Sequence, residues 1–577
     1  MKINTSMKPV AAAVFAFAVA SAYAGESIDF GDGMMLDWRL TASYVNSVRM
    51  NDAAGLLSKS ATNSGGNDGD NNFAKGATTA NALSLLVETT LRKGDSGFVF
   101  SGSTFYDDAY HQTNSNNAAA NNPNGVNKPA PFNQFTDAAV QAQGGYGRIL
   151  DAYGYTAFKV GDESRATVRL GRHVVNWGES TFFPNIAYAQ GPFDGTKTGI
   201  PGTEVKDSVL PEDQISASLE VNPRWTLLMQ AQYGFHPTIA AAPGSYLSTS
   251  DGVGPGGSCL GPYTSIPAIP AFSFGGFSGC SFGSRGADVT PSDVGQWGLG
   301  TRWRATDETE LGLYYLNYND RTPLPYINVM TPGTAIPVAL QPSFGGITQI
   351  GNGSYQIHYF DNVKLVGGTV STTLGSVAVT AELTYKQGAP SLVNTLVNPL
   401  APAAASSYIP TPTRSDITQL NLGAFANLAR SPLADSIQIL AELSAIQTSN
   451  VQAVKAPGTE AFPAAFGFVP GSTLSFGPAN ALAFTGMLIL GYPGIAEGWD
   501  LTVPISYSTQ LNGRTLVGGV GGEGDQRYSV GASFAYKGNL SIGVTYLGFL
   551  GDPSVNLQTY RPLTDRDQLS VNMKYTF

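Results

Sequence analysis

The sequence predicts an all-β outer-membrane protein, an up-and-down antiparallel transmembrane barrel of about 18 strands, with 16 as the alternative count. Three observations lead to this fold. Many segments alternate apolar and polar residues with the period of two that marks a β-strand with two unlike faces. The connections between these segments are alternately short and long, and the chain opens with an export signal. No later stretch approaches the length of a membrane-spanning helix.

The export signal is expected at residues 1–24. Lys2 and Lys8 precede an apolar run over 10–20, and Ala22-Tyr23-Ala24 gives a small-x-small cleavage pattern before Gly25. The alternative, a first transmembrane helix, is disfavoured because the run is well short of the ~20 residues that a bilayer requires. The mature chain, 25–577, is therefore predicted to be exported by a bacterium and to form the barrel in its outer membrane.

The composition agrees with many strands joined by glycine-rich turns. Only 13% of residues are charged, yet the mean hydropathy is −0.04, so the chain is neither a typical soluble protein nor uniformly apolar. The net charge of −10 argues against a nucleic-acid partner, which requires a basic face.

Eighteen segments carry the alternating pattern. They are 36–47, 83–92, 97–106, 149–160, 164–172, 213–221, 225–235, 295–304, 309–318, 363–373, 376–386, 415–427, 436–447, 480–491, 499–508, 525–536, 539–549 and 567–577. In the last of them, every second residue from Leu569 to Phe577 is apolar or aromatic, and the residues between are polar.

The connections fix the topology. Turn-like connections lie at 93–96, 161–163, 222–224, 306–308, 375 and 537–538. The alternate connections are long: 48–82, 107–148, 173–212, 236–294, 319–362, 387–414, 448–479, 509–524 and 550–566. In a simple up-and-down sheet all short turns then fall at one edge, as the periplasmic turns of outer-membrane barrels do. An even strand count places both termini on that periplasmic side.

Two features concern the membrane interfaces. Charged residues of the strands are expected to face the lumen, because a charge at the lipid midplane costs ~2–4 kcal/mol. Aromatic residues near strand ends are expected in the two interfacial girdles: Trp38, Tyr44, Trp225, Trp303, Tyr314 and Trp499.

The final aromatic pair, Tyr575 and Phe577, resembles the recognition signal of the barrel assembly machinery; the alternative is an accidental terminal phenylalanine.

Two cysteines, Cys259 and Cys280, lie in one segment rich in Gly, Ser and Phe. In an exported chain they are predicted to form a disulfide. Closing a loop of this size stabilises it by roughly 3 kcal/mol. This bond would hold one long loop together.

The long loop 173–212 is the candidate constriction of the lumen. A barrel of this size encloses a wide lumen, and segment 25–35 is too short to plug it, so long loops must. Interior charges set selectivity in pores. The predicted constriction or gating residues are Arg169, Arg172, Trp177, Glu179, Glu204 and Lys206. The alternative is that Arg169, Arg172, Glu179 and Glu204 pair with one another and hold the loop against the wall.

Exposed aromatic side chains in long loops suggest capture of apolar ligands, because such surface is otherwise a liability. The predicted ligand-contact residues are Phe182, Phe183, Phe272, Phe274, Phe277, Phe466 and Phe468. The alternative is that these aromatic loops pack on one another as a lid.

Signals for enzymatic or metal chemistry are poor. Gly178-Glu179-Ser180 lacks the second glycine of a nucleophile elbow, since position 182 is Phe. The four histidines lie in predicted loops without metal-ligand spacing, and the acid- and amide-rich run 63–72 lacks the spacing of a calcium loop. No catalytic residue, cofactor or metal is predicted.

Several segments resemble one family, the outer-membrane proteins named domain of unknown function 1302. They are RLGRHVVNWGESTFFPN at 169–185, PGTEVKDSVLP at 201–211, PGSYLSTSDGVG at 243–254, the strand pair within 296–323, and 564–568. The resemblance implies a barrel that handles hydrophobic compounds or lipids. It also implies a periplasmic lipid-carrier-like partner and an inner-membrane exporter. The Ala/Pro-rich loop 387–414 shows no family pattern.

The sequence and this resemblance together predict an outer-membrane conduit for hydrophobic or amphipathic small molecules, such as a lipid, fatty acid or hydrocarbon. It would sit in outer-membrane lipid and work with periplasmic partners. The alternative is a structural or docking barrel of a trans-envelope lipid-trafficking assembly, with a sealed lumen.

Overall fold

The barrel is seen in a computed structural model of the chain. The structure describes residues 25, 27–63, 65–117, 128, 131–197, 208–260, 263–266, 277–280, 283–335, 338–339, 349–397, 407–453, 471–516 and 521–577. The expected signal peptide, 1–24, lies outside this set and stays a prediction.

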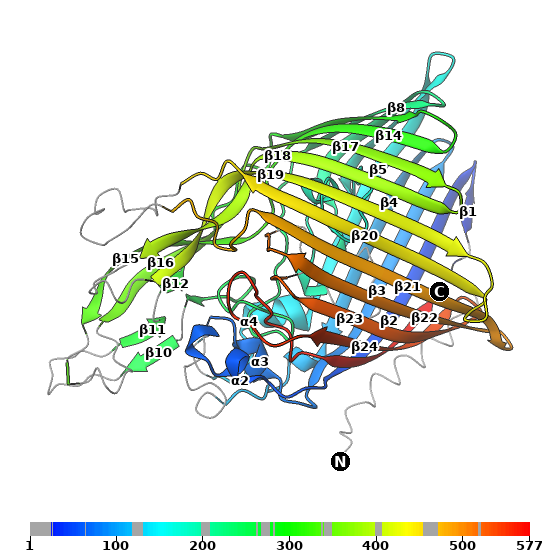
Figure 1. The fold of residues 1–577 in the computed structure, drawn as a ribbon. Coiled ribbons are helices and arrows are strands. Elements are labelled where there is room, and N and C mark those ends of the chain that lie inside the picture. The colour runs from blue at the N-terminus through cyan, green and yellow to red at the C-terminus, as the bar shows by residue number, and fades with distance from the viewer. Residues whose placement is uncertain are drawn as a thin grey trace.

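Eighteen antiparallel strands form the wall (Figure 1). They are β2 (Met34–Arg49), β3 (Thr78–Lys93), β4 (Ser96–Asp107), β5 (Gly145–Val160), β6 (Ser164–His173), β7 (Glu212–Asn222), β8 (Trp225–Gln232), β13 (Gln296–Arg304), β14 (Thr309–Tyr318), β17 (Val363–Leu374), β18 (Val377–Val397), β19 (Ser407–Leu428), β20 (Ser436–Ser449), β21 (Asn480–Ala496), β22 (Trp499–Asn512), β23 (Gln526–Tyr536), β24 (Leu540–Leu550) and β25 (Gln568–Thr576). Each of the eighteen predicted segments is one of these strands, and the alternative count of 16 is excluded.

The wall closes where the last strand meets the first. β25 pairs with β2 from Thr576, opposite Thr41, to Gln568, opposite Arg49. The amide of Phe577 donates to the carbonyl of Leu40 at 2.8 Å, so the ladder continues to the final residue. A short strand, β1 (Ile28–Gly31), pairs with β2 at the same rim. In the part of the chain that the structure describes, no helix is long and apolar enough to cross a membrane.

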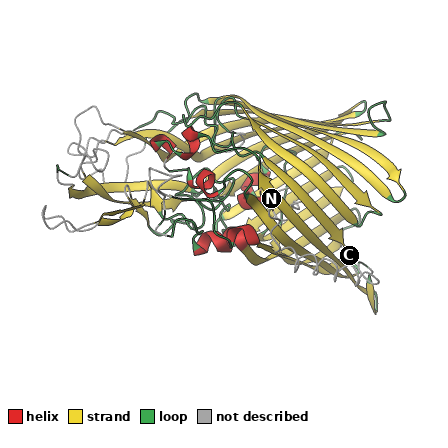
Figure 2. Ribbon diagram, turned by 90° about the horizontal axis from the view of Figure 1, so that it is seen from below, coloured by secondary structure: helices red, strands yellow, loops and turns green. Residues whose placement is uncertain are grey.

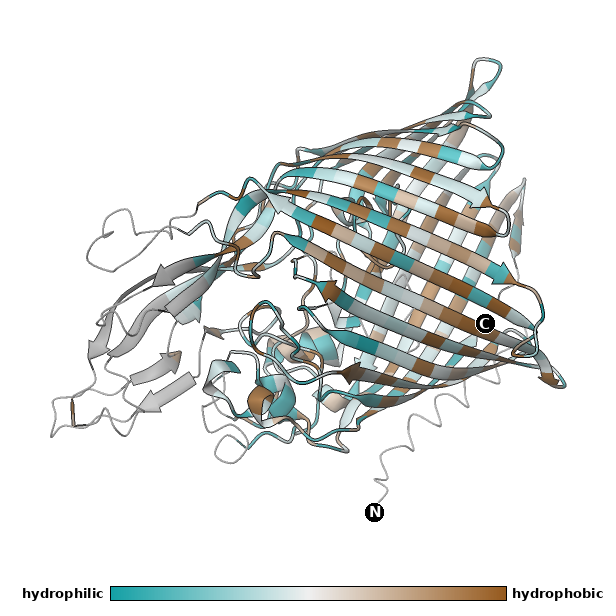
Figure 3. Cartoon of the chain, viewed as in Figure 1, coloured by the Kyte–Doolittle hydropathy of each residue, from teal (hydrophilic) through white to brown (hydrophobic). Residues whose placement is uncertain are grey.

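The two faces of the wall differ as the alternation requires. Hydrophobic and hydrophilic residues alternate along the strands (Figure 3), and large apolar side chains are exposed on the outside; Leu313 is 65% exposed and Leu383 is 52% exposed. Facing inward, Glu382 and Glu442 are buried. Lipid on the outside explains this inversion of the usual soluble pattern. A closed barrel with an apolar outer belt is the architecture of outer-membrane proteins, and this chain is one of them.

One girdle prediction is wrong. Trp225 and Trp303 are exposed on the outer face, as expected. Tyr314, by contrast, is 3% exposed and belongs to a buried cluster inside the barrel. The even-numbered residues of β14 face the lumen, so Tyr314 packs against Trp177 and Ile186 inside the barrel and does not reach the membrane interface.

The loop expected at 387–414 is largely strand. β18 and β19 continue to pair beyond Lys386, from Ala389 opposite Ser415 to Val397 opposite Ser407. Their backbone groups satisfy one another outside the membrane, so the ladder need not stop at the barrel rim. These extensions and the hairpin of β15 (Leu324–Ala335) and β16 (Gln349–His358) form a projection from the long-loop end (Figure 1).

Further short elements occur in long loops that were predicted without structure. Strand β12 (Gly283–Arg285) pairs with β16 and with β9 (Cys259–Leu260), and β10 (Tyr263–Ile266) pairs with β11 (Phe277–Cys280). Short helices lie at the long-loop end of the barrel (Figure 2): α2 (Gly55–Ser58), α3 (Asp68–Asn72) and α4 (Asp137–Ala139).

Candidate transport site inside the barrel

An inward loop, residues 174–197, leaves the end of β6 and fills part of the lumen. The wall strand β18 holds it through one carboxylate. Glu382 accepts hydrogen bonds from the backbone amides of Glu179 (2.6 Å), Ser180 (3.2 Å) and Ile186 (2.8 Å). Gly178 permits this approach, because a Cβ there would lie 2.6 Å from the Glu382 carboxylate. Charge-assisted bonds of this kind are about twice as strong as neutral ones.

A second wall carboxylate holds the next residues of the inward loop. Glu442 on β20 accepts from the amides of Thr181 (2.9 Å), Phe182 and Phe183 (3.4 Å). Asn421, on β19 between the two acids, donates to the carbonyl of Phe183 at 2.9 Å. The side chains of Glu382 and Glu442 together accept hydrogen bonds from six backbone amides of the inward loop. These bonds fix the loop at mid-barrel.

The start of the inward loop packs against a part of the wall where glycines leave room for its side chains. Trp177 is 5% exposed, and its ring stacks on Tyr314 with centroids 5.9 Å apart. Its carbonyl accepts from Arg302 at 3.0 Å. Glycines make room for these side chains: a Cβ at Gly298 would lie 2.9 Å from the Trp177 ring, and one at Gly367 would meet the loop's Ile186 at 3.0 Å.

The far end of the inward loop is held by β4 and β5. Asp194 forms an ion pair with Arg148 (2.9 Å) and accepts from the Tyr146 hydroxyl (3.1 Å). The Lys197 ammonium lies 3.2 Å from the centroid of the Phe105 ring, a cation–π contact. The inward loop therefore crosses the lumen from one side of the wall to the other.

A cavity of about 1000 Å³ remains between the inward loop and the wall of β21–β25. The cavity is lined by residues of the wall, of the inward loop and of the loops over the mouth of the barrel. They include Thr485, Met487, Pro504, Ser506, Ser508, Ser529, Ser533, Ser541, Thr545, Leu547, Phe549, Asn572 and Lys574, with Phe182, Leu247 and Leu563. Among the described lining residues none is a carboxylic acid.

Hydroxyl groups run across this wall in cross-strand pairs. The pairs are Thr485 with Ser508 (3.0 Å), Ser506 with Ser529 (2.6 Å) and Ser533 with Ser541 (3.0 Å). Each hydroxyl has a donor and two acceptor positions, so a paired hydroxyl keeps hydrogen-bonding capacity for a ligand. We call these six residues the hydroxyl track.

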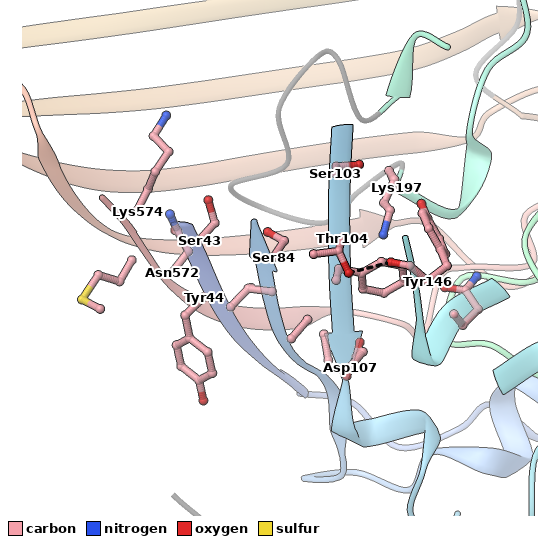
Figure 4. Close-up of a pocket in the computed structure, with 16 residues that line it drawn as sticks. Ser43, Tyr44, Ser84, Ser103, Thr104, Asp107, Tyr146, Lys197, Asn572 and Lys574 are labelled. Carbon is pink, nitrogen blue, oxygen red and sulfur yellow. Dashed lines mark hydrogen bonds between the residues drawn. The ribbon is translucent and has the colours of Figure 1, made fainter. Parts of the chain in front are cut away.

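A smaller cavity of about 60 Å³ continues the space toward β2–β4 (Figure 4). It shares Asn572 and Lys574 with the large cavity. Ser43, Ser84 and Ser103 line its wall, with Lys197 from the inward loop on the other side. The open part of the lumen is therefore bounded by small hydroxyl-bearing side chains together with larger apolar ones.

Loops over the long-loop end form a lid, defined here as 54–72, 243–251 and 563–567. Arg566 binds Asp70 through two bonds of 2.9 Å, and Arg49 binds Asp565 at 3.2 Å. The Arg566 guanidinium also donates to the carbonyl of Tyr246 at 2.7 Å. Burial raises the pKa of the Asp565 carboxyl, and the neighbouring Asp70 raises it further. Leu247 and Leu563 place this lid directly against the large cavity.

A second ionic cluster lies at the same end, beside β7 and β8. Glu212, Asp213 and His236 bring ligand-type atoms within 4.8 Å of one another. Arg172 binds Asp213 (2.7 Å), and Arg321 binds Glu212 (3.3 Å), so each carboxylate already has a cationic partner. The hydrogen bond to Glu212 raises the pKa of His236, although burial and Arg172 oppose this. The two carboxylates and their basic partners therefore form an ion-pair cluster.

The family model described as "Protein of unknown function (DUF1302)" matches residues 7–577. This chain belongs to the DUF1302 family. The resemblance inferred from the sequence segments is thereby confirmed. No curated protein matches this DUF1302 chain.

Solved structures similar to this DUF1302 protein include Acinetobacter baumannii OccAB1, with 10% identity, 96% of this chain and 98% of that chain covered, and a TM-score of 0.42. A BenF-like porin from Pseudomonas fluorescens Pf-5 has 10% identity, coverage of 95% and 100%, and a TM-score of 0.40. Pseudomonas aeruginosa OccK2 (OpdF) in complex with glucuronate has 11% identity, coverage of 94% and 98%, and a TM-score of 0.38. Likenesses at this level carry no argument about the substrate.

The predicted constriction residues of this DUF1302 protein divide into three groups. Trp177 and Glu179 lie in the inward loop, and burial raises the pKa of the Glu179 carboxyl. Arg169 stays on the β6 wall, 5.9 Å from the Tyr153 ring, and Arg172 belongs to the ionic cluster. Glu204 and Lys206 lie outside the described residues.

The predicted aromatic contacts are also divided. Phe182 lines the large cavity, whereas Phe183 is 3% exposed and packs inside the inward loop. Phe277 is the first residue of β11. Phe272, Phe274, Phe466 and Phe468 lie outside the described residues. The predicted disulfide between Cys259 and Cys280 is confirmed, with an S–S distance of 2.02 Å.

Sequence reasoning missed the wall residues that hold the inward loop. Glu382 appears in the alternating pattern only as one polar residue among several, and Glu442 likewise. A single acid in the middle of a membrane strand is a usable signal, because its charge must be neutralised or hydrogen-bonded inside the lumen. Among the described residues Arg172 pairs with Asp213; Glu204, one of the two acids of the alternative pairing, lies outside the described residues.

Proposed function

We propose that this DUF1302 protein is an outer-membrane conduit for hydrophobic or amphipathic small molecules of the lipid, fatty acid or hydrocarbon type. The observation that supports it best is the large cavity between the inward loop and the wall of β21–β25. This cavity is large enough for a small organic ligand. Its lining combines apolar side chains, hydroxyl groups and the two cations Arg527 and Lys574, which suits a ligand with an apolar and a polar part.

The two halves of the lining suit the two parts of an amphipathic ligand. Met487, Leu547 and Phe549 project from the wall, and Phe182 projects from the inward loop. These side chains can cover an alkyl chain, which gains about 25 cal/mol per Å² of apolar surface removed from water. The hydroxyl track offers hydrogen bonds to a polar head group.

The envelope partners of the conduit are part of the proposal. A periplasmic lipid-carrier-like protein and an inner-membrane exporter follow from the family resemblance, and the barrel assembly machinery follows from the terminal aromatic pair. Tyr575 and Phe577 have ring centroids 4.7 Å apart at the rim where the barrel closes. A co-purification of the full chain with periplasmic extract tests the first of these partners.

The second candidate function is a docking barrel with a sealed lumen. The observation in its favour is the number of bonds that hold the inward loop, because a loop fixed by Glu382 and Glu442 resists movement. The two functions differ in what they predict for ligand transfer. A docking barrel needs its outer and periplasmic surfaces but not its cavity.

The test fills the cavity without changing the wall. Ser541 faces the cavity, and its neighbour Ile542 is 37% exposed on the membrane face. Ser541→Trp is expected to slow transfer of a fluorescent fatty acid into proteoliposomes severalfold, and Ile542→Trp is the matched control. Equal transfer by both variants and the unchanged protein, with transfer above that of empty liposomes, would argue for a route elsewhere. Transfer no faster than in empty liposomes would favour the docking barrel.

A further inference from the structure

A proline interrupts the wall beside the large cavity. Pro504 is an interior residue of β22 and lines the cavity. Proline has no N–H to donate to a ladder and restricts the residue before it. For that reason proline is rare in strands that have neighbours on both sides. A barrel has no edge strand, so Pro504 occupies a position that normally excludes it.

The pairing between β22 and β23 stops at this proline. Thr502 pairs with Ser533, and Ile505 pairs with Val530, in the same register. In this fully described stretch, no pair is formed at Val503 or Pro504. We call this interval the seam. The register is the same on both sides of the seam, so the ladder lacks pairs only at these two positions, where proline has no N–H to donate, and it contains no extra residue of a β-bulge.

The neighbouring contacts of the same wall are continuous. β23 pairs with β24 at every residue from Gln526 to Tyr536. β21 and β22 pair at every residue from Ala483 to Tyr492. The interruption is therefore specific to one strand boundary and does not reflect a generally loose wall.

The wall is also thin at the seam. Gly531 stands opposite Pro504, and a Cβ there would lie 3.4 Å from the Pro504 ring. Ser529 and Ser533 flank this glycine on the lumen side and line the cavity. On the membrane side the seam is bordered by Ile505 and by Val530, which is 44% exposed. At the seam, a glycine and two serines on the lumen side and two aliphatic side chains on the membrane side therefore separate the cavity from lipid.

Two other boundaries of the cavity are held by ionic or charge-assisted contacts. On the long-loop side, the lid residues Leu247 and Leu563 cover it, and a buried Arg566–Asp70 pair holds the lid. Toward the opposite wall, Phe182 belongs to the inward loop, which Glu442 anchors. An apolar ligand that leaves through the seam displaces neither of these contacts.

We propose that the seam at Pro504 is a lateral portal between the cavity and the hydrocarbon core of the outer membrane. This inference rests on the proposed function and narrows the ligand to molecules that partition into a bilayer. Backbone groups at the seam need partners in lipid, so the portal is closed at rest and opens by brief separation of β22 from β23. A permanently charged solute is excluded by the apolar border.

The test locks the seam with a disulfide. Val503 and Ala532 face each other in the register of the flanking pairs, and in Val503→Cys with Ala532→Cys they become a cysteine pair. Because Cys259 and Cys280 are already joined, the introduced thiols are the reactive ones. In proteoliposomes, oxidation is expected to slow transfer of a pyrene-labelled alkane about tenfold, because a covalent bond removes the open state. Reductant is expected to restore it.

The control locks the next boundary instead. Phe534→Cys with Ile542→Cys joins β23 to β24 at a paired position away from the seam and is expected to leave transfer unchanged. Pro504→Val, which restores an N–H, is expected to slow transfer without any crosslink. Fast transfer through a fully crosslinked seam, confirmed by mass spectrometry, would overturn the portal and leave the conduit intact. No transfer by the unmodified protein would overturn the conduit itself.

Discussion

Arg566 and Asp70 form a two-point ion pair between side chains that are both fully buried, although they are 496 residues apart in the sequence. The pair joins the last long loop to the first, over the mouth of the barrel. Burying two charges is costly unless their geometry is good and their remaining polar atoms are satisfied. Here the guanidinium also donates to the carbonyls of Tyr246 and Ser248, so every nitrogen of the Arg566 guanidinium has a hydrogen-bond partner.

Breaking this pair is expected to loosen the lid. Asp70→Asn leaves Arg49 and Arg566 buried without their shared counter-charge, and removal of one partner of a buried pair costs about 3–5 kcal/mol. Protease digestion of intact cells is expected to cleave the lid of the variant much faster. The control is Asp52→Asn, which removes an exposed partner of Lys75 and should change nothing. Equal cleavage of the two variants would contradict the role assigned to Arg566 and Asp70.

Weakening one anchor of the inward loop is expected to widen the lumen. Glu442→Gln keeps the side-chain shape but replaces a carboxylate, which accepts three amide hydrogen bonds, with a neutral amide. Bonds to a charged acceptor contribute about 1.5–3 kcal/mol each. Single-channel conductance in planar bilayers should rise or become noisy. The same change at the exposed Glu220 of β7 serves as control, and identical traces for both would show that Glu442 does not restrain the inward loop.

Two adjacent glycines give a matched test of how the inward loop packs. Gly367 faces the lumen, where a Cβ would press on Ile186 at 3.0 Å; Gly368 faces outward, where a Cβ would lie at an ordinary 3.6 Å from Leu313. Gly367→Ala is expected to lower the unfolding temperature, since overpacking costs about 1–3 kcal/mol. Gly368→Ala should have little effect. A larger loss for Gly368→Ala would reverse the assignment of the two faces.

The His236 pair predicts a pH dependence. The bond to Glu212 raises the His236 pKa above its ordinary 6.5, so the folded state binds this proton more tightly than the unfolded state. The stabilisation is fully present below pH 6.5 and is lost as the pH rises through the raised pKa. The difference in unfolding temperature between the native protein and His236→Gln should therefore shrink with increasing pH. A difference that is constant across this range would contradict the pairing.

The barrel could be predicted from the sequence because the membrane imposes one rule on every strand. Lipid admits no polar outer face, so the alternation survives in all eighteen strands. The rule does not apply beyond the rim of the barrel, and there the prediction of a loop at 387–414 was wrong. β18 and β19 continue past Lys386 because they pair with each other, a partnership that the alternation alone does not reveal.

The site was predictable in part for a similar reason. The length of 173–212 and the aromatic Trp177 indicated a loop inside the lumen, and that is where the structure places residues 174–197. Its partners Glu382 and Glu442 could not be assigned, because they lie about 200 or more residues away and nothing local marks them as anchors. Tyr314 was misplaced because an aromatic residue near a strand end suits either the girdle or a packed loop.

The proposed function requires an apolar ligand to occupy the space between the inward loop and the hydroxyl track. Anomalous diffraction from crystals of the full chain soaked with a brominated alkyl probe would locate such a ligand. We expect a bromine peak inside the barrel, in contact with Phe182 and the lumen face of β23. Bromine found only around the outside of the barrel, with the cavity holding ordered water, would contradict it.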